Sequence, residues 1–438
     1  MADMDMSYGR ATREEIEQLQ LERLQAVLHR VYKNVDFYRE SFHGRDFFPD
    51  DMVSLDGLQN LPTTGRETLV TNHPYGMFAV PLREVIRLQP TSSVAKEAIV
   101  VGFTRNDIDH WTDLAARSLL SAGVERDDLV QIYVDYGLFQ GALGLHYGAE
   151  KVGASVIPSS SISPDTEFEM MKDYHATVLV TTPHRALRLT NYVKENNINA
   201  KNLTLKTCLL VGQYWSESVR TRFEESIYAP VFDCYGHNEI VSSGIAAECE
   251  KRNGLHINED HFIAEIVDPG SGKPLGPGQR GELVITTLTK EAFPLIRYKT
   301  GDITRLNYEP CECGNNFVRM DRVSSRTDDM VFIGGVNVFP SQIERIIAGA
   351  AGTEAPAPVF RLVLEGTGAS ESVEVLIEVN EAIFSDELRF MKAIEEKIRG
   401  ELFDLLGITA RVCLVEPGKL GAEGTTRERV VDRREMES

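Results

Sequence analysis

The sequence predicts an α/β fold with a large N-terminal α/β domain, which includes a small antiparallel β subdomain, and a small α+β domain at the C-terminus. Three patterns support this prediction. From about residue 114 to 215, helix-like stretches alternate with β-branched runs that are apolar on both faces, as in a parallel sheet covered by helices. Short strands broken by Gly and Pro follow, and a strand, helix, strand pattern fills about the last hundred residues. We expect domains at 1–327 and 328–438, with the β subdomain at about 254–325.

The spacing of apolar residues places the individual elements. Thr12 and Glu15 form a capping box before a helical apolar stripe that runs from Ile16 to Val31, so an N-terminal amphipathic helix is expected. Core strands are expected at LVQIYV (129–134), ASVIP (154–158), TVLVTT (177–182) and TCLLVG (207–212). In the C-terminal domain we expect an alternating strand, a helix and a last strand, at Val373 to Val379, Leu388 to Leu405 and RVCLV (411–415).

Charge and composition exclude several classes of partner. The chain of 438 residues carries 66 acidic and 46 basic side chains, for a net charge of -20. This charge repels nucleic acids and anionic membranes, so neither is expected as a partner, although a pocket can still bind a small anion such as ATP. The N-terminus lacks an apolar run behind a basic start, and no stretch of about eighteen residues is wholly apolar, so the protein is expected to be cytoplasmic.

The first candidate for ligand binding is the sequence YGHNE, which directly follows a short strand-like run. A strand that ends in Tyr235 and Gly236 lets the backbone approach a ligand, and Glu239 offers a hard oxygen for Mg²⁺ on nucleotide phosphates. Asn238 can donate a hydrogen bond, and His237 can add a positive charge near neutral pH or line a pocket sterically. The alternative is a polar loop without a ligand.

The second candidate is Asp302, which lies in a Gly-Asp turn within PLIRYKTGDITRL. A carboxylate in this position can accept hydrogen bonds from both ribose hydroxyls of a nucleotide. Asp after Gly is also a common turn sequence, so the alternative is a structural turn.

Four motifs that follow one another along the chain show that these candidates belong to a family resemblance. YGxxE, RYxTGD, RTDD and GVNVFPSQIE follow one another between Tyr235 and Glu344. With LPTTGRETLVTNHPYGMFAVPLREV (61–85), VVGFTRND (100–107), YGLFQGALGLHYGAEKVGASVIP (136–158) and GLHINEDHF (254–262), nearly the whole chain resembles the adenylate-forming enzymes and, among them, the phenylacetate-CoA ligase family.

The resemblance implies a ligase that activates an aryl or related carboxylic acid with ATP and Mg²⁺ and transfers it to CoA. It also implies a mobile C-terminal domain and suggests a homodimer. Under this match Glu239 is catalytic and holds Mg²⁺. His237 and Asn238 are further catalytic candidates, although they replace an apolar residue and a phosphate-contacting Ser or Thr of the family. Tyr235, Gly236, Asp302 and Arg326 bind the nucleotide, Asp328 is the hinge, and Gly334, Gly335 and Val336 line the CoA channel.

The chain departs from the family where phosphate is handled. The family's phosphate loop is glycine-rich and carries a Lys, whereas this chain has no Gly between Thr91 and Ile99 and has Glu97 at the Lys position. A carboxylate repels a triphosphate and Cβ atoms crowd a backbone cradle. Ser92 and Ser93 remain as candidate nucleotide contacts, and Lys96 can partly substitute for the missing Lys.

Other departures affect the adenine loop and the C-terminus. The adenine loop is represented by Gly212 to Trp215 and is one residue short. The family's C-terminal Lys is absent and Arg427 lies nearby, and Gly334 occupies the position of a family Arg. Together these changes predict slow or altered adenylation. Two alternatives to the ligase therefore stay open, namely a non-catalytic binding protein and an enzyme that transfers the acyl group to an amine.

An aromatic group follows the first core strand. Tyr133, Tyr136 and Phe139, with Gly212 at the end of a later strand, are the candidate acyl pocket and would suit an aryl acid. Aromatic residues at strand ends are also common in plain cores.

Three cysteines lie in polar, glycine-containing segments, unlike the other three. Cys249, Cys311 and Cys313 with His256 would form a closed tetrahedral set suited to structural Zn²⁺, and the alternative is four unconnected loop residues. The remaining cysteines, Cys208, Cys234 and Cys413, lie in apolar strand-like runs and suit a reducing compartment.

Overall fold

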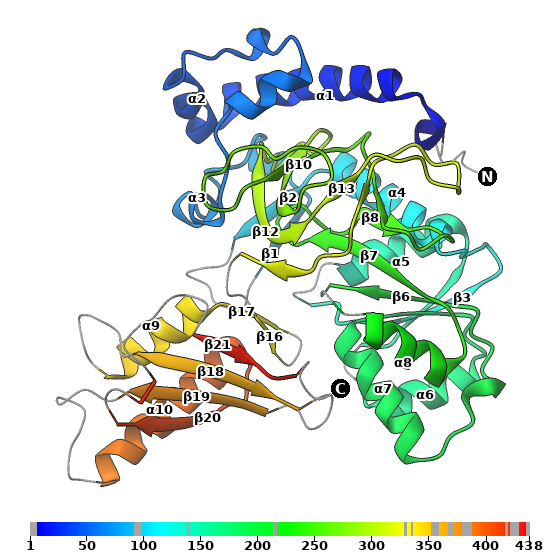
Figure 1. The fold of residues 1–438 in the computed structure, drawn as a ribbon, viewed down its shortest axis with the longest axis vertical. Helices are drawn as coiled ribbons and strands as arrows, with labels where there is room; N and C mark the ends of the chain where they lie inside the picture. Colours follow the sequence, from blue (N-terminus) through cyan, green and yellow to red (C-terminus); the bar gives the residue numbers. More distant parts are fainter. Residues whose placement is uncertain are drawn as a thin grey trace. The chain divides into compact units, whose positions relative to one another are not determined.

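The protein is described here by a computed structural model, which covers residues 7–91, 99–137, 141–160, 162–212, 215, 217–327, 331–333, 336–351, 359–366, 372–378, 388–416, 419–420 and 429–434. The chain divides into two compact units, a large one and a small one, with the main boundary between Thr327 and Asp328 (Figure 1). Among the described helices, none is both long and apolar enough to cross a membrane.

A nine-stranded sheet forms the centre of the large unit, in the order β13-β14-β9-β8-β7-β6-β5-β3-β4. Its parallel part contains β3 (Leu129–Tyr133), β4 (Ser155–Pro158), β5 (Val178–Thr181), β6 (Thr207–Val211) and β7 (Val231–His237). The four strands predicted between 129 and 212 are confirmed. The helices of this part are α4 (Arg105–Ser121), α5 (Gly141–Val152), α6 (Pro164–Asp173), α7 (Pro183–Glu195) and α8 (Glu217–Ile227).

Both faces of this parallel sheet are buried, as its apolar runs predicted. Neighbouring residues along β5 and β6 alternate between two apolar clusters, with Leu179 and Leu210 in one and Val180 and Leu209 in the other. Because side chains alternate along a strand, the two clusters lie on opposite faces of the sheet. The predicted fold class is therefore confirmed.

The antiparallel segment differs from its prediction in one respect. A separate four-stranded antiparallel sheet contains β10 (Phe262–Val267), β11 (Gly281–Thr287), β12 (Tyr298–Thr304) and β15 (Ser325–Arg326). However, β9 (Leu255–Ile257), β13 (Leu306–Asn307) and β14 (Arg319–Met320) extend the central sheet beyond β8 (Val241–Glu248). The segment around 254–325 thus supplies two sheets rather than one subdomain, because period-two alternation does not specify which strand is the partner.

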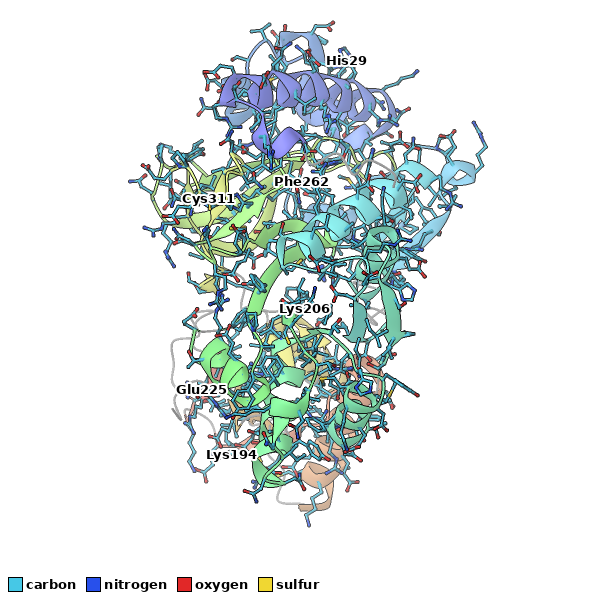
Figure 2. All side chains as sticks on the ribbon, turned by 90° about the vertical axis from the view of Figure 1, so that its right-hand side faces the viewer. His29, Lys194, Lys206, Glu225, Phe262 and Cys311 are labelled. Carbon is cyan, nitrogen blue, oxygen red and sulfur yellow. The ribbon has the colours of Figure 1, made fainter. Side chains whose placement is uncertain are left out.

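The N-terminal helix α1 (Arg13–Asn34) begins with the predicted capping box between Thr12 and Glu15. Its buried Gln20 donates hydrogen bonds to the carbonyl oxygens of Glu259 (2.9 Å) and Phe262 (3.1 Å), and Figure 2 shows Phe262 beneath this helix. These bonds attach α1 to the β9–β10 region. The other elements of the N-terminal part are α2 (Asp36–His43), α3 (Arg66–Thr71), β1 (Arg87–Pro90), β2 (Val100–Phe103) and short 3-10 turns at Ser7–Arg10, Pro49–Asp51, Leu55–Asn60, Leu82–Glu84 and, later, Ala200–Asn202.

The small unit has its own sheet, in the order β20-β19-β18-β21, and its own apolar core. Its elements are β16 (Val331–Ile333), β17 (Val336–Val338), α9 (Pro340–Ala351), β18 (Phe360–Glu365), β19 (Ser372–Glu378), α10 (Leu388–Leu406), β20 (Arg411–Val415) and β21 (Val430–Asp432). The predicted strand, helix, strand unit is confirmed as β19, α10 and β20, and the two strands are parallel. Val373, Val375 and Ile377 are buried as their alternation predicted.

Candidate nucleotide and metal sites

Three of the predicted nucleotide residues meet around one buried carboxylate. The Tyr235 hydroxyl donates to Asp302 Oδ2 at 2.5 Å, and Arg326 pairs with Asp302 Oδ1. Arg326 also donates to the carbonyl oxygen of Thr300 at 2.9 Å. Burial and the Asp302 carboxylate together raise the pKa of Tyr235 well above its ordinary value, so its hydroxyl stays protonated and remains a donor.

Local sheet geometry explains how these residues meet. Asp302 on β12 lies directly opposite Arg326 on β15, and cross-strand pairs of opposite charge stabilise a sheet. The β11–β12 register shifts around Gly301, whose φ of +80° favours glycine, and such a bulge re-aims the neighbouring side chain. Tyr235 reaches Asp302 from β7 and so links the two sheets.

The turn after β7 holds a second charged pair. His237 Nδ1 lies 2.8 Å from Glu239 Oε2, and His237 Nε2 donates to the Thr300 carbonyl oxygen at 3.1 Å. Burial lowers the pKa of His237, but the Glu239 carboxylate outweighs burial and raises it above the ordinary value. Burial likewise raises the pKa of Glu239, but His237 and then Arg66 outweigh this and lower it to about 2. Glu239 is therefore ionised throughout the neutral range.

Residue 236 must be glycine because a side chain there would clash with the backbone of the adjacent strand. A Cβ at this position would lie 2.2 Å from the carbonyl carbon of Ser242 on the adjacent β8. β7 and β8 therefore approach closely at Gly236, next to the turn that carries the half-buried Asn238 and the buried Glu239. Sequence reasoning missed Thr300 and Arg66, because their contribution depends on register and on long-range packing rather than on a motif.

The candidate acyl residues occupy different environments. Tyr133 is buried in an apolar cluster, and its hydroxyl donates to the carbonyl oxygen of Ile162 at 2.9 Å, so core packing accounts for it without a ligand. Tyr136 lies three residues after the end of β3 and contacts His146 Nδ1 through its hydroxyl at 3.1 Å. β4 and β5 flank β3 on opposite sides, and ligands bind where the order of parallel strands reverses. Tyr136 thus lies at this switch point, and Gly212 lies exposed after β6 with a φ of +82°.

Several predicted site residues lie outside the described residues. These are Ser92, Ser93 and Lys96 of the phosphate loop, Phe139, the hinge Asp328, and Gly334 and Gly335 of the CoA channel. The departures at Glu97 and Arg427 lie outside as well. Val336 is the first residue of β17.

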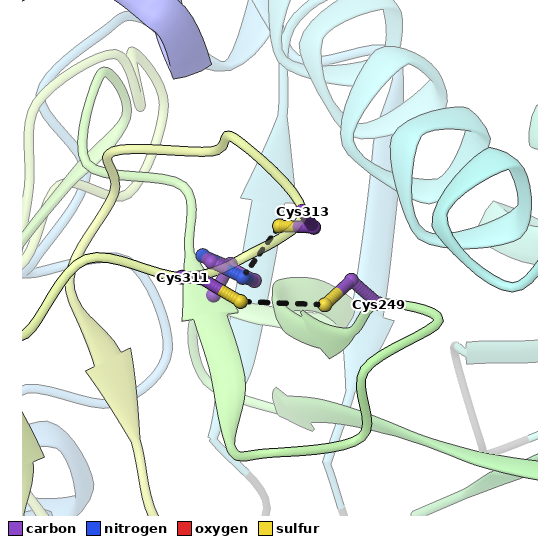
Figure 3. Close-up of side chains that lie close together, drawn as sticks. Cys249, Cys311 and Cys313 are labelled. Atoms are coloured by element: carbon purple, nitrogen blue, oxygen red, sulfur yellow. Dashed lines mark hydrogen bonds between the residues drawn. The ribbon is translucent and has the colours of Figure 1, made fainter.

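The four predicted metal ligands come together. The ligand atoms of Cys249, His256, Cys311 and Cys313 all lie within 4.8 Å of one another (Figure 3). The Cys249 and Cys311 sulfurs are 3.8 Å apart, and Cys313 Sγ is 3.4 Å from His256 Nε2. A tetrahedral Zn²⁺ site with ordinary bond lengths has S–S edges of about 3.8 Å and S–N edges of about 3.5 Å. His256 Nδ1 lies 3.2 Å from the Phe317 carbonyl oxygen, which leaves Nε2 for a metal.

Comparisons with known proteins show to which family this chain belongs. The family model for AMP-binding enzymes matches residues 136–289, and that for the AMP-binding enzyme C-terminal domain matches residues 335–434. The phenylacetate-coenzyme A ligase of Thermus thermophilus is 37% identical over 436 residues, which cover 96% of this chain and 97% of that protein. The phenylacetate-coenzyme A ligase of Escherichia coli is 36% identical over 428 residues, with 97% of each chain covered.

A solved structure of an acid–CoA ligase is also similar to this chain. A 2-hydroxyisobutyryl-CoA ligase in complex with 2-HIB-AMP and CoA superimposes with a TM-score of 0.88 at 26% identity and covers 97% of this chain and 91% of that one. The likeness thus extends over both units. This chain belongs to the phenylacetate-coenzyme A ligase family of AMP-binding enzymes.

Proposed function

We propose that this protein is an ATP-dependent acid–CoA ligase, which activates a carboxylic acid as its adenylate and transfers the acyl group to CoA. The acid carboxylate displaces pyrophosphate from ATP, and the CoA thiol then displaces AMP. The observation that carries the proposal is the Tyr235, Asp302 and Arg326 cluster, set within a chain that matches acid–CoA ligases along almost its entire length. The relatives favour this function over the two alternatives, a non-catalytic binding protein and an acyl transfer to an amine.

Asp302 is the proposed ribose contact. Each carboxylate oxygen can accept about two hydrogen bonds, so Tyr235 and Arg326 leave one acceptor position on each oxygen for the two ribose hydroxyls. The same two neighbours fix the direction of the carboxylate before the nucleotide arrives, which reduces the ordering cost of binding. Because Glu239 stays ionised, it can supply a hard oxygen ligand to Mg²⁺.

The proposed acid is an aryl or related carboxylic acid that binds at the switch point after β3, where Tyr136 lies. The names of the relatives support an aryl acid, whereas the name of the solved ligase indicates a small branched hydroxy acid. Both kinds therefore belong in a substrate panel.

We also propose a structural Zn²⁺ at Cys249, His256, Cys311 and Cys313. The chemistry of the donor set supports this, since three thiolates and one imidazole close the coordination shell and leave no position for a substrate. A cytoplasmic location agrees with six cysteines that form no disulfide. The family resemblance also suggests a homodimer, which light scattering tests.

The proposed function is tested by product analysis. The purified protein is incubated with ATP, Mg²⁺ and CoA and with a panel of phenylacetate-type, benzoate-type and short hydroxy acids, and acyl-CoA, AMP and pyrophosphate are quantified. We expect acyl-CoA from at least one acid, and loss of at least about a hundredfold in rate in Asp302→Ala. Asp321→Ala removes a carboxylate that pairs with Arg305 and serves as the control. AMP without acyl-CoA would show that the adenylate is hydrolysed rather than transferred to CoA and would contradict CoA as the acceptor. No turnover with any acid would contradict the whole proposal.

A further inference from the structure

Trp215, in the loop after β6, packs against a guanidinium group from a distant part of the chain. The indole is buried, and the guanidinium carbon of Arg322 lies 3.7 Å from its ring centroid. Arg220 also faces this ring, but at 4.9 Å. A separation of 3.7 Å is well within cation–π range, and Trp is the aromatic side chain that attracts a cation most strongly.

Arg322 also binds the loop and β7 through all of its guanidinium nitrogens. Nη2 donates to the Trp215 carbonyl oxygen at 2.5 Å, Nη1 lies 2.6 Å from Glu217 Oε2, and Nε lies 3.3 Å from Asp233 Oδ2. Trp215 and Glu217 are two points of the connection between β6 and α8. Arg322 therefore links both of these described points to the neighbouring strand β7.

The same segment that carries Arg322 also carries the proposed nucleotide contact Arg326. Asp233 and Tyr235 are two residues apart on β7 and therefore project from the same face of the strand. Asp233 pairs with Arg322, and Tyr235 joins Arg326 through Asp302. The segment from 322 to 326 is thus attached to one face of β7 at two points, one beside the loop after β6 and one at the proposed ribose contact.

We infer that Arg322 is a positioning residue for the base of the nucleotide, which holds Trp215 and Glu217 at a fixed place relative to Asp302. The inference rests on the proposed function for the identity of the ligand. The expected place of the base comes from the family resemblance, which assigns Gly212 to Trp215 to the adenine. It agrees with the position of Trp215 after the carboxyl end of β6, which is adjacent and parallel to β7.

A purely structural role belongs to the neighbouring Arg220 instead. Arg220 is buried, contacts both carboxylate oxygens of Glu248 at 2.7 and 3.0 Å, and donates to the carbonyl oxygen of Val231. Breaking this buried pair leaves an uncompensated charge in the core. Arg322 is more exposed, with 18% of its side chain accessible, so its removal should change the loop more than the fold.

The test compares Arg322→Met and Arg322→Lys with wild type in steady-state kinetics and in calorimetric titrations with AMP. Because displacement of a contact by about 1 Å can cost a hundredfold, we expect Arg322→Met to raise the KM for ATP and the Kd for AMP about tenfold or more. The KM values for the acid and CoA should stay within about twofold. Arg322→Lys keeps the charge without the planar stacking group, so an intermediate value is expected. Arg305→Met, which removes an exposed pair with Asp321, is the matched control.

Fluorescence gives a readout that does not need turnover. The chain has two tryptophans, Trp111 and Trp215, so in a Trp111→Phe background the emission reports Trp215 alone. We expect a red-shifted emission when Arg322→Met is added, since water replaces the stacked guanidinium. An unchanged emission together with an unchanged KM for ATP would overturn the inference, and so would equal losses toward ATP, acid and CoA. Should wild type bind neither AMP nor ATP, the proposed function fails, and a shifted emission would still show that Arg322 holds Trp215.

Discussion

At the scale of single residues, burial and neighbouring charges set the orientation and the protonation state of the proposed site residues. Asp302 is held by a hydroxyl and a guanidinium, while Glu239 is held by an imidazole. The sequence could predict Tyr235, Asp302 and Glu239, because each belongs to a short motif with its own chemistry. It could not predict Arg66 or Thr300, because their effect arises only when α3, β7 and β12 are packed together.

The His237 and Glu239 pair predicts a specific pH dependence of stability. The folded-state pKa of His237 is raised, so its stabilising contribution is fully present below the unfolded pKa and is lost as pH rises through the folded pKa. Glu239→Gln removes the carboxylate that raises this pKa, so the fall in thermal midpoint between about pH 6 and 8 should be shallower than in wild type. Calorimetry over this range measures the difference. His29→Gln removes an exposed pair with Asp50 and should keep the wild-type slope.

Glu167 predicts a second pH effect, away from the proposed site. Its carboxylate is buried, accepts hydrogen bonds from Gln131 (2.6 Å) and Ser159 (3.2 Å), and burial raises its pKa from 4.5 to about 7. The associated stability is present below about pH 4.5 and is lost as pH rises through about 7. Glu167→Gln should therefore flatten the stability profile between pH 5 and 7.5 in urea unfolding. Glu169→Gln, on the exposed side of α6, should leave it unchanged.

At the scale of elements, the close packing of the β7–β8 hairpin predicts that a methyl group added at Gly236 destabilises the protein. Gly236→Ala would place a Cβ 2.2 Å from a backbone atom of β8, so the hairpin must open. Overpacking of this kind costs about 1–3 kcal/mol, and we expect a loss of stability in that range by urea unfolding together with weaker AMP binding. Gly276→Ala, at an exposed turn with only ordinary contacts, is the control. Equal stability of the two variants would contradict a steric requirement for glycine at position 236.

The segment between β13 and β14 carries Cys311 and Cys313 and is hydrogen-bonded to the N-terminal segment. Metal binding is therefore expected to stabilise the N-terminal segment. The backbone N–H of Asn316 donates to the Gly9 carbonyl oxygen at 2.7 Å, and its side chain donates to Ala11. Elemental analysis should find about one Zn²⁺ per chain, as four protein ligands make a complete structural site. Chelation or Cys311→Ser should lower the thermal midpoint and speed hydrogen exchange at the start of the chain. Cys413→Ser, outside the cluster, should retain the metal, and full stability after metal removal would contradict a structural role.

The elements also show where sequence patterns stop being informative. The apolar runs of β3 to β6 predicted a two-sided parallel sheet, because burial on both faces leaves a clear pattern. The sequence around 254–325 predicts antiparallel strands but not their division between two sheets, since partner choice depends on contacts far apart in sequence. Tyr133 fits the acyl-pocket prediction because it is aromatic and ends a strand, and a core residue fits that description equally well.

At the scale of the whole molecule, the proposed nucleoside contacts Tyr235, Asp302 and Arg326 meet in the structure, whereas the sequence from 91 to 99, the proposed phosphate loop, has no Gly and carries Glu97. This contrast predicts that activity is limited by phosphate handling. Glu97→Lys restores a positive charge, and since one positioned donor is worth about a hundredfold, we expect kcat for adenylation to rise about tenfold or more. Glu84→Lys makes the same charge change on an exposed side chain and is the control. Lower activity in Glu97→Lys would show that the loop has its own working solution.

The most direct test of the central claim is acid-dependent exchange of labelled pyrophosphate into ATP, measured without CoA. The exchange isolates formation of the acyl adenylate and does not depend on the acceptor. If the chain uses Asp302 to bind the nucleoside and activates a carboxylic acid, wild type will show exchange that requires an acid and that Asp302→Ala abolishes. The account is contradicted if no acid supports exchange, or if Asp302→Ala exchanges as fast as wild type.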